Sequence, residues 1–190
     1  LDFNLSRAIK FKLSTEKINL KQFLQESLQL FEYQCKIKSI FLKLKMSPLV
    51  PNEIFTDKNR LNQILINLIG NALKFTSIGG ITISVKESLK NKDCLEISVE
   101  DTGMGIKEED KGKLFQIFGK LEIGTPMNSQ GVGLGLTISN DLAKILCCGL
   151  QGINLQSEYG KGTKFSFLIK KHLNVLPTRI STQNFSYEDL

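Results

Sequence analysis

Two asparagines and a lysine accompany an apolar helix near the middle of the chain. From Arg60 to Thr76 apolar residues recur every third or fourth position, which predicts an amphipathic helix lying on a core. Asn67, Asn71 and Lys74 share a narrow sector beside that stripe. Amide oxygens suit Mg²⁺ and an ammonium group suits phosphate. The plain alternative, two satisfied amides and a solvated lysine, is favoured on the helix alone.

The segment DTGMGI, residues 101–106, follows a predicted strand and must turn the chain. Gly103 and Gly105 allow the backbone to approach a flat ligand, because no Cβ intervenes. An ionised Asp101 would accept a hydrogen bond from the exocyclic amine of adenine and repel the carbonyl oxygen of guanine. Alone the pattern is weak, since an Asx turn has the same composition.

Three alternating glycines in GVGLGL, residues 131–136, precede another predicted helix. Glycines before a helix N-terminus free backbone N–H groups to bind phosphate. The spacing differs from the GxGxxG of a dinucleotide fold, and the later GKGT at 160–163 lacks the order of a Walker A loop. A flexible hinge is the alternative.

The hydrophobic patterns around these motifs predict an α+β domain. We expect a two-layer sandwich in which a mixed, mostly antiparallel sheet of about five strands packs on three helices. Asp57 is expected to cap the central helix, and strands 81–88 and 94–101 to form a hairpin. The predicted helices are 21–35, 57–75 and 134–147, with a short one in 107–115, and the predicted strands are 16–20, 40–46, 53–56, 81–88, 94–101, 152–158 and 163–170.

Composition limits the classes of protein that remain. The 190 residues fit one domain, and a net charge of +6 spread over scattered lysines does not indicate a nucleic-acid partner. No apolar run reaches the roughly 18 residues of a membrane helix, so we expect a soluble cytoplasmic domain, whether or not its parent protein is membrane-anchored. The four cysteines (35, 94, 147 and 148) are expected to be buried, reduced thiols. The one histidine, His172, offers no metal cluster and is interpreted as a solvated bystander.

Together the motifs are far more specific than each alone. Their order is the asparagine–lysine helix, DTGMGI, a phenylalanine loop (LFQIFGK, 114–120), GVGLGL and GKGTKF (160–165). Over residues 40–170 this order resembles the catalytic ATP-binding domain of sensor histidine kinases, of the GHKL or Bergerat ATP-binding superfamily, and most of all the hybrid kinases. The resemblance implies ATP and Mg²⁺ as cofactors. It implies that residues 1–12 end a truncated dimerisation helix, residues 13–170 form the catalytic domain and residues 171–190 are a linker or tail.

The resemblance also implies roles for individual residues. Asn71 matches the metal-ligating asparagine, Asn67 its companion near metal and phosphates, and Lys74 the phosphate-binding lysine. Lys120 matches a basic residue reaching the terminal phosphate, although it departs from the family pattern after the phenylalanine. The implied catalytic residues are Asn67, Lys74 and Lys120. The implied base pocket is Phe75, Asp101, Gly103, Gly105, Ile106 and Thr163, the lid aromatics are Phe115 and Phe118, and the phosphate loop is Gly131, Gly133, Leu134, Gly135 and Leu136.

The same fold occurs in chaperone, gyrase and mismatch-repair ATPases, so the fold does not assign the reaction. Those relatives carry a water-activating glutamate at the position of Asn67, and asparagine cannot act as a general base. We therefore expect transfer of the γ-phosphoryl group to a histidine on a dimerisation domain outside this chain. A response-regulator receiver would act downstream, and a homodimer is expected only in the full-length protein. An ATPase, or a nucleotide-binding module without phosphotransfer, remains the alternative.

Overall fold

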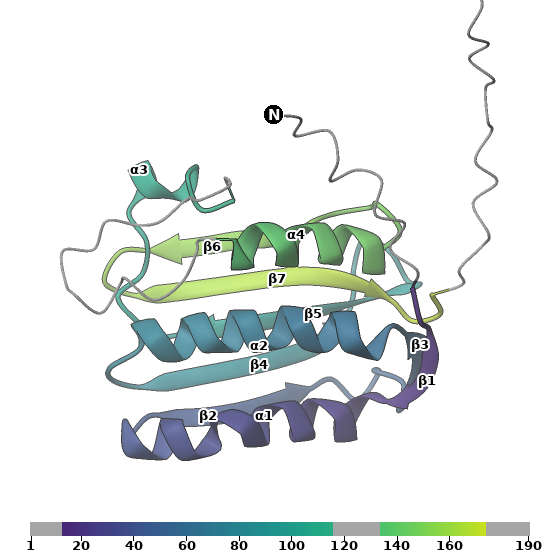
Figure 1. The fold of residues 1–190 in the computed structure, drawn as a ribbon, viewed down its shortest axis with the longest axis horizontal. Coiled ribbons are helices and arrows are strands. Elements are labelled where there is room, and N and C mark those ends of the chain that lie inside the picture. Colours follow the sequence, from purple (N-terminus) through teal and green to yellow (C-terminus); the bar gives the residue numbers. More distant parts are fainter. Residues whose placement is uncertain (1–12, 116–133, 174–190) are drawn as a thin grey trace, which may run out of the picture.

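Five strands form a sheet that carries three long helices on one face (Figure 1). The computed structural model describes residues 13–115 and 134–173. Strand β2 runs parallel to β4, and the other neighbouring strands of this sheet are antiparallel. The predicted α+β fold with a mixed, mostly antiparallel sheet is confirmed. In spatial order the strands are β2 (Phe41–Met46), β4 (Gly80–Glu87), β5 (Cys94–Asp101), β7 (Gly162–Lys170) and β6 (Asn154–Glu158).

The helices and a second, smaller sheet complete the described part of the fold. Helices α1, α2 and α4 lie side by side over the larger sheet, and α3 is a single turn (Figure 1). Strands β1 and β3 pair antiparallel at one end of the molecule. These elements are α1 (Leu20–Ile37), α2 (Lys58–Phe75), α3 (Glu108–Lys111), α4 (Gly135–Leu146), β1 (Glu16–Asn19) and β3 (Glu53–Thr56).

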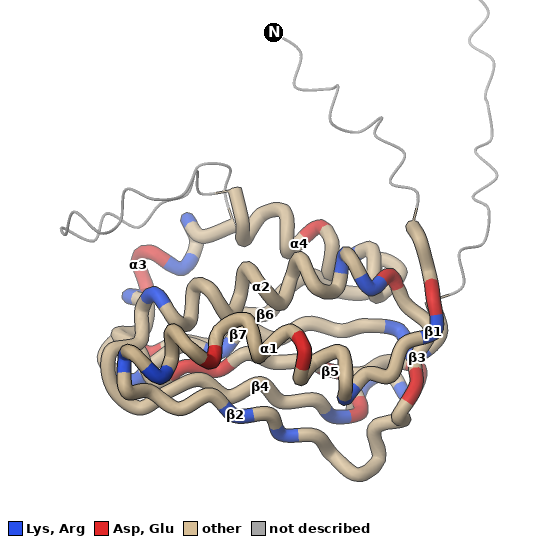
Figure 2. The backbone as a smooth tube through the Cα atoms, turned by 60° about the horizontal axis from the view of Figure 1, so that its bottom comes forward, with Lys and Arg blue, Asp and Glu red and all other residues tan. Residues whose placement is uncertain are grey.

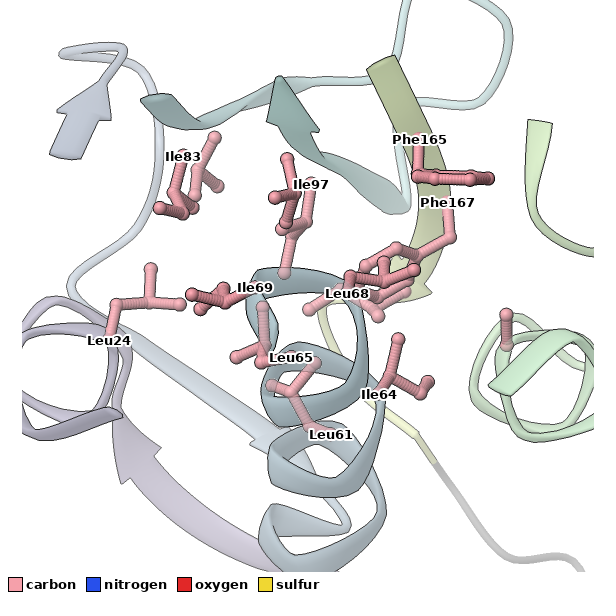
Figure 3. Packing of buried hydrophobic residues seen from close by; sticks show 14 of the residues in the cluster. Leu24, Leu61, Ile64, Leu65, Leu68, Ile69, Ile83, Ile97, Phe165 and Phe167 are labelled. Carbon is pink, nitrogen blue, oxygen red and sulfur yellow. The ribbon is translucent and has the colours of Figure 1, made fainter. Parts of the chain in front are cut away.

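Helix α2 is the centre of the hydrophobic core. Asp57 caps it as predicted, because one carboxylate oxygen accepts from the backbone N–H of Arg60 at 3.0 Å and the other from that of Ser14 at 2.9 Å. Most of the predicted apolar stripe is buried, and Figure 3 shows it directed at side chains of β4, β5 and β7, whereas Leu73 is only partly buried. The buried residues of α2 are Leu61, Ile64, Leu65, Leu68, Ile69 and Ala72.

The alternation of side chains along β5 decides which of them face the helices. Ile97 and Val99 are buried in the core, whereas Glu100 is exposed on the other face of the sheet. Asp101 is the next inward position and is only 7 % exposed. The strand therefore delivers a carboxylate to the helix-covered face of the sheet.

Charged residues of both signs are spread over the described backbone (Figure 2). Several pair across neighbouring strands: Lys86 with Glu96 at 3.1 Å, and Lys164 with Glu100 at 3.5 Å. Exposed pairs of this kind each contribute less than about 1 kcal/mol to stability, so the buried apolar layer, rather than these pairs, holds the sheet to its helices.

The described fold continues to Leu173, past the predicted boundary at 170. Leu173 is buried, and its backbone N–H donates to the Phe55 carbonyl at 2.8 Å. His172 forms a parallel bridge with Phe55, and its side chain is exposed as expected. Residues 1–12 and 174–190, interpreted above as a helix end and a tail, lie outside the described residues. None of the described helices combines the length and the apolar character needed to span a bilayer.

The four cysteines are free thiols, as predicted. Three of them are buried, but Cys148 is exposed, so the expectation of burial is wrong at that position. The reason is local: Cys148 lies beyond the end of α4 with a φ of 56°, where the chain leaves the helix.

Leu68→Ala should destabilise the protein by about 2–5 kcal/mol, because it opens a cavity where the α2 side chain is completely buried. The measurement is urea unfolding followed by circular dichroism. Ile66→Ala is the matched control, since Ile66 lies on the same helix and is 39 % exposed, and it should cost much less. Equal losses for the two variants would contradict the packing described for α2.

Candidate functional site

Asn67 joins α2 to the beginning of α4. Its amide nitrogen donates to the Ser139 hydroxyl at 2.9 Å, and Ser139 is buried. Its amide oxygen would stand 2.3 Å from a Cβ added at Gly135, so a larger residue there would displace the Asn67 side chain. The structure thus brings the asparagine motif to the last glycine of GVGLGL, although the two are far apart in the sequence.

Asn71 and Lys74 extend this row toward the end of α2. The Asn71 side chain is partly exposed and makes no hydrogen bond to any described residue. The ammonium of Lys74 lies 5.3 Å from the centroid of the Phe75 ring, and within the described residues it has no acidic partner. An amide oxygen and an ammonium group are therefore both available to a ligand.

Asp101 is a buried carboxylate held by a backbone turn. Its Oδ1 accepts from the backbone N–H of Gly103 at 2.8 Å, which is the Asx turn considered as the alternative above. Desolvation raises the pKa of Asp101 above its ordinary value, opposed by backbone hydrogen bonds from Gly103 and Thr163 and increased by the nearby charge of Glu100. A carboxylate has two oxygens and several acceptor sites, so this turn does not use all the acceptor sites of Asp101.

The glycines of DTGMGI fit against backbone on both sides. A Cβ at Gly103 would stand 2.4 Å from the Phe75 carbonyl oxygen, and one at Gly105 would stand 2.1 Å from that of Glu158. Gly105 also has a φ of 66°, which disfavours other residues. The turn at Gly103 and Gly105 therefore packs between the end of α2 and the end of β6.

Three polar residues on the neighbouring strands β5, β7 and β6 lie beside this turn. Asp101 pairs with Thr163, and Thr163 pairs with Ser157. The Ser157 hydroxyl donates to the Gly162 carbonyl at 2.8 Å and accepts from the backbone N–H of Ile106 at 2.9 Å. Since its single proton is used, the Thr163 hydroxyl, 3.0 Å away, donates to it. An open hollow of about 460 Å³ is lined by these three residues and also by Glu100, Gln156 and Lys164, which alternate to the other face of the sheet.

Ser157 was missed by the sequence analysis, although it fixes the position of Ile106. Its place two residues after the partly buried Leu155, on the inward side of β6, is the signal that could have identified it. Ser139, whose hydroxyl accepts from Asn67, was also missed, because a serine on a helix carries no signal of its partner.

The structure places the described site residues around the last turns of α2. Leu134 and Leu136 border the first turn of α4, and Leu136 packs against the core. The Phe115 carbonyl accepts from the Thr137 hydroxyl at 3.3 Å, which brings the start of the phenylalanine loop to α4. The predicted residues Phe118, Lys120, Gly131 and Gly133 lie outside the described residues.

A protein-family model described as "Histidine kinase-, DNA gyrase B-, and HSP90-like ATPase" matches residues 56–173. The chain belongs to this family. Its fold and motifs define it as a GHKL ATP-binding domain of the histidine kinase type, which confirms the resemblance found in the sequence.

Two similar proteins are named as signal transduction histidine kinases. The chain is 33 % identical over 188 residues to hybrid signal transduction histidine kinase B of Dictyostelium discoideum, covering 97 % of this chain and 9 % of the relative. It is 36 % identical over 176 residues to signal transduction histidine-protein kinase BarA of Escherichia coli K12, covering 92 % of this chain and 19 % of the relative. The chain therefore spans less than a fifth of either protein.

Two solved structures share the fold. Full-length ShkA in complex with AMPPNP matches with a TM-score of 0.70 and 28 % identity, over 83 % of this chain and 31 % of that one. The catalytic domain of histidine kinase ThkA, in a nucleotide-free form, matches with a TM-score of 0.66 and 26 % identity, over 84 % of this chain and 99 % of that one.

The raised pKa of Asp101 predicts a pH-dependent difference between the parent chain and Asp101→Asn. The carboxyl of Asp101 binds its proton more tightly in the folded protein than in the unfolded chain. The free energy of unfolding therefore falls as the pH rises from 3.8, the ordinary pKa, through the raised pKa of the folded protein. Asparagine cannot ionise, so the variant should gain stability relative to the parent across that window and no further above it. Urea unfolding of both proteins at several pH values measures the difference, and a difference independent of pH would contradict the desolvation of Asp101.

Proposed function

We propose that this chain binds Mg²⁺–ATP and passes the γ-phosphoryl group to a histidine on a dimerisation domain of the full-length protein. The observation that carries the proposal is the junction at the end of α2. There the row of Asn67, Asn71 and Lys74 leads through Phe75 to the turn that holds Asp101. The side chains suited to phosphates and the carboxylate suited to a base therefore lie next to one another.

The adenine base would lie over the turn at 101–106. The buried Asp101 would accept from the exocyclic amine of the base, in the neighbourhood of Thr163 and Ile106. A Cβ at Gly103 would meet the Phe75 carbonyl oxygen and the Asp101 carboxylate, so glycine lets the turn hold this carboxylate close to the end of α2. Phe75, partly exposed at the end of α2, would provide an aromatic contact for the base.

The donor set of the row fits Mg²⁺ as it occurs in nucleotide complexes. Within the described ranges no group of three or more His, Cys, Asp or Glu gathers to hold a metal. Amide oxygens, here those of Asn71 and Asn67, are hard ligands that hold Mg²⁺ together with substrate phosphates. The metal would neutralise charge on the phosphates, and Lys74 would add a second positive charge beside them.

The structure around Asn67 favours phosphotransfer over hydrolysis. Its amide nitrogen is committed to Ser139, and an amide has no basic site to activate water. ATP would therefore remain intact until a histidine nitrogen attacks its γ-phosphorus and ADP leaves. The catalytic contribution of this chain would be positioning and charge neutralisation, in which Lys74 and, near the terminal phosphate, Lys120 would take part.

The proposed partners follow from the hybrid kinases that the chain resembles. The acceptor histidine would come from the dimerisation domain, a receiver domain would take the phosphoryl group next, and dimerisation would belong to the full-length protein. We place the domain in the cytoplasm, where ATP is available.

Isothermal titration of the chain with ATP and Mg²⁺, followed by incubation with radiolabelled ATP and a separate dimerisation domain, tests the proposal. Transfer should yield an acid-labile, base-stable phosphohistidine that depends on the added domain. Steady phosphate release by the chain alone would indicate the ATPase instead. Binding without transfer to any dimerisation domain would indicate a nucleotide-binding module.

Asn71→Ala should weaken Mg²⁺–ATP binding by roughly 1.5–3 kcal/mol, because a charge-assisted ligand is lost. Titration calorimetry measures this difference. Asn59→Ala is the matched control, since Asn59 is an exposed asparagine near the other end of the same helix. If the Asn71 variant bound Mg²⁺–ATP as tightly as the parent, the assignment of Asn71 as a metal ligand would be wrong.

Asp101→Asn should weaken ATP more than GTP, because only adenine presents an amine to the carboxylate. Competition of each nucleotide against a fluorescent ATP analogue gives the ratio of the two affinities. Asp93→Asn makes the same charge change at an exposed position and should leave both affinities unaltered. An equal loss of both nucleotides in the Asp101 variant would refute the adenine-reading role.

A further inference from the structure

The last turn of α2 ends without a glycine cap. The residue that follows, Thr76, is extended, with a φ of −101° and a ψ of 123°, so no left-handed residue closes the helix. Thr76 satisfies the Ala72 carbonyl with its backbone N–H at 3.0 Å and its hydroxyl at 2.7 Å. The carbonyls of Leu73 and Lys74 remain, and they need donors from outside α2.

Lys38 supplies these donors from the end of α1. Its ammonium nitrogen lies 2.6 Å from the Leu73 carbonyl oxygen, 3.5 Å from that of Lys74 and 3.2 Å from that of Thr76. An ammonium group has three N–H donors, and its charge is favourable at the negative end of a helix dipole. Lys38 is therefore the C-terminal cap of α2, contributed by another helix.

The backbone around Lys38 is itself well fixed. Its N–H donates to the Gln34 carbonyl at 3.1 Å, and that of Ile40 donates to the Cys35 carbonyl at 3.0 Å. Ser39, between them, has a φ of 55° and ends α1 sharply. Cys35 and Ile40 are buried, so the turn is anchored in the core. Helices α1 and α2 end at the same end of the molecule, where this side chain crosses from one to the other (Figure 1).

The turn that Lys38 caps is in direct contact with the turn that carries Asp101. The Phe75 carbonyl lies between the carbonyls bound by Lys38, and it accepts from the backbone N–H of Met104 at 3.3 Å. The same oxygen faces Gly103 at a distance that leaves no room for a Cβ. Fraying of the end of α2 would therefore displace the Asp101 turn together with Lys74.

We propose that Lys38 is a positioning residue for nucleotide binding: it caps α2 and thereby holds the phosphate-side and base-side halves of the site in register. The proposal rests on the proposed function for its readout in nucleotide affinity. It does not require Lys38 to touch the nucleotide.

Lys38→Met tests this role, because it keeps most of the aliphatic stem and removes the donors. Lys38→Arg is the conservative variant, and Lys36→Met removes a neighbouring positive charge that has no interaction with any described residue. Each 190-residue chain is titrated with Mg²⁺–ATP under conditions where urea unfolding shows it to be folded. Exchange of the Met104 backbone amide is measured by NMR without nucleotide. Lys38→Gln, shorter and neutral, replaces the methionine variant if that variant does not fold.

We expect Lys38→Met to raise the Kd about fivefold, the scale of one lost hydrogen bond, and to accelerate exchange at Met104. Lys38→Arg should restore both, and Lys36→Met should change neither. A folded Lys38→Met with the parent's affinity, or an equal loss in Lys36→Met, would overturn the proposal. If the parent itself does not bind ATP, the proposed function fails. The exchange rate of the Met104 amide then still tests the capping role, because an unchanged rate in Lys38→Met would contradict it.

Discussion

The apolar face of α2 has to lie on the sheet, and the rest of the site depends on where that contact puts the helix. Burial of six residues on one side leaves only a narrow polar margin, in which Asn67, Asn71 and Lys74 stand. Rotation of α2 about its axis would expose its buried residues to water, so these three polar side chains stay on the side of the helix where they are found. The hydrophobic core therefore orients groups that do not belong to it.

Close backbone contacts then determine how the parts of the site meet. Gly103 and Gly105 let the turn after β5 press against the end of α2 and the end of β6. Gly135, at the start of α4, lies instead against the side-chain amide of Asn67. A methyl group at Gly103 or Gly105 would push apart segments that are distant in the sequence, which explains these two glycines without invoking flexibility.

Periodicity was sufficient to predict α2, its Asp57 cap, the β4–β5 hairpin and the sides of the strands, because each is a local property of the chain. The candidate site residues in DTGMGI and on α2 were predicted from their types and spacing, and the resemblance implied their roles. The spacing after Leu155 indicates the side of β6 on which Ser157 lies, but the partners of Ser157 and Lys38 could not be found in this way. A serine in a strand and a lysine after a helix are ordinary surface residues until the fold supplies the carbonyl or amide that each one binds.

The pairing at the other end of the molecule was also beyond sequence reasoning. Periodicity assigns strands but not partners, so it did not reveal that β3 pairs with β1 or that the chain at 171–173 returns to Phe55. The predicted boundary at 170 followed from polar composition alone. The backbone hydrogen bonds of Phe55 with Lys171 and Leu173 are what extend the fold past it.

Phe55 of β3 pairs with Lys17 of β1 on one side and with His172 on the other, so residues near both ends of the described chain meet on this one strand. Helix α2, about 27 Å long at 1.5 Å per residue, separates this strand from the turn at Asp101. Strand β3 is thus covered on both edges by the two ends of the described chain, so fraying of either end would expose one of its edges.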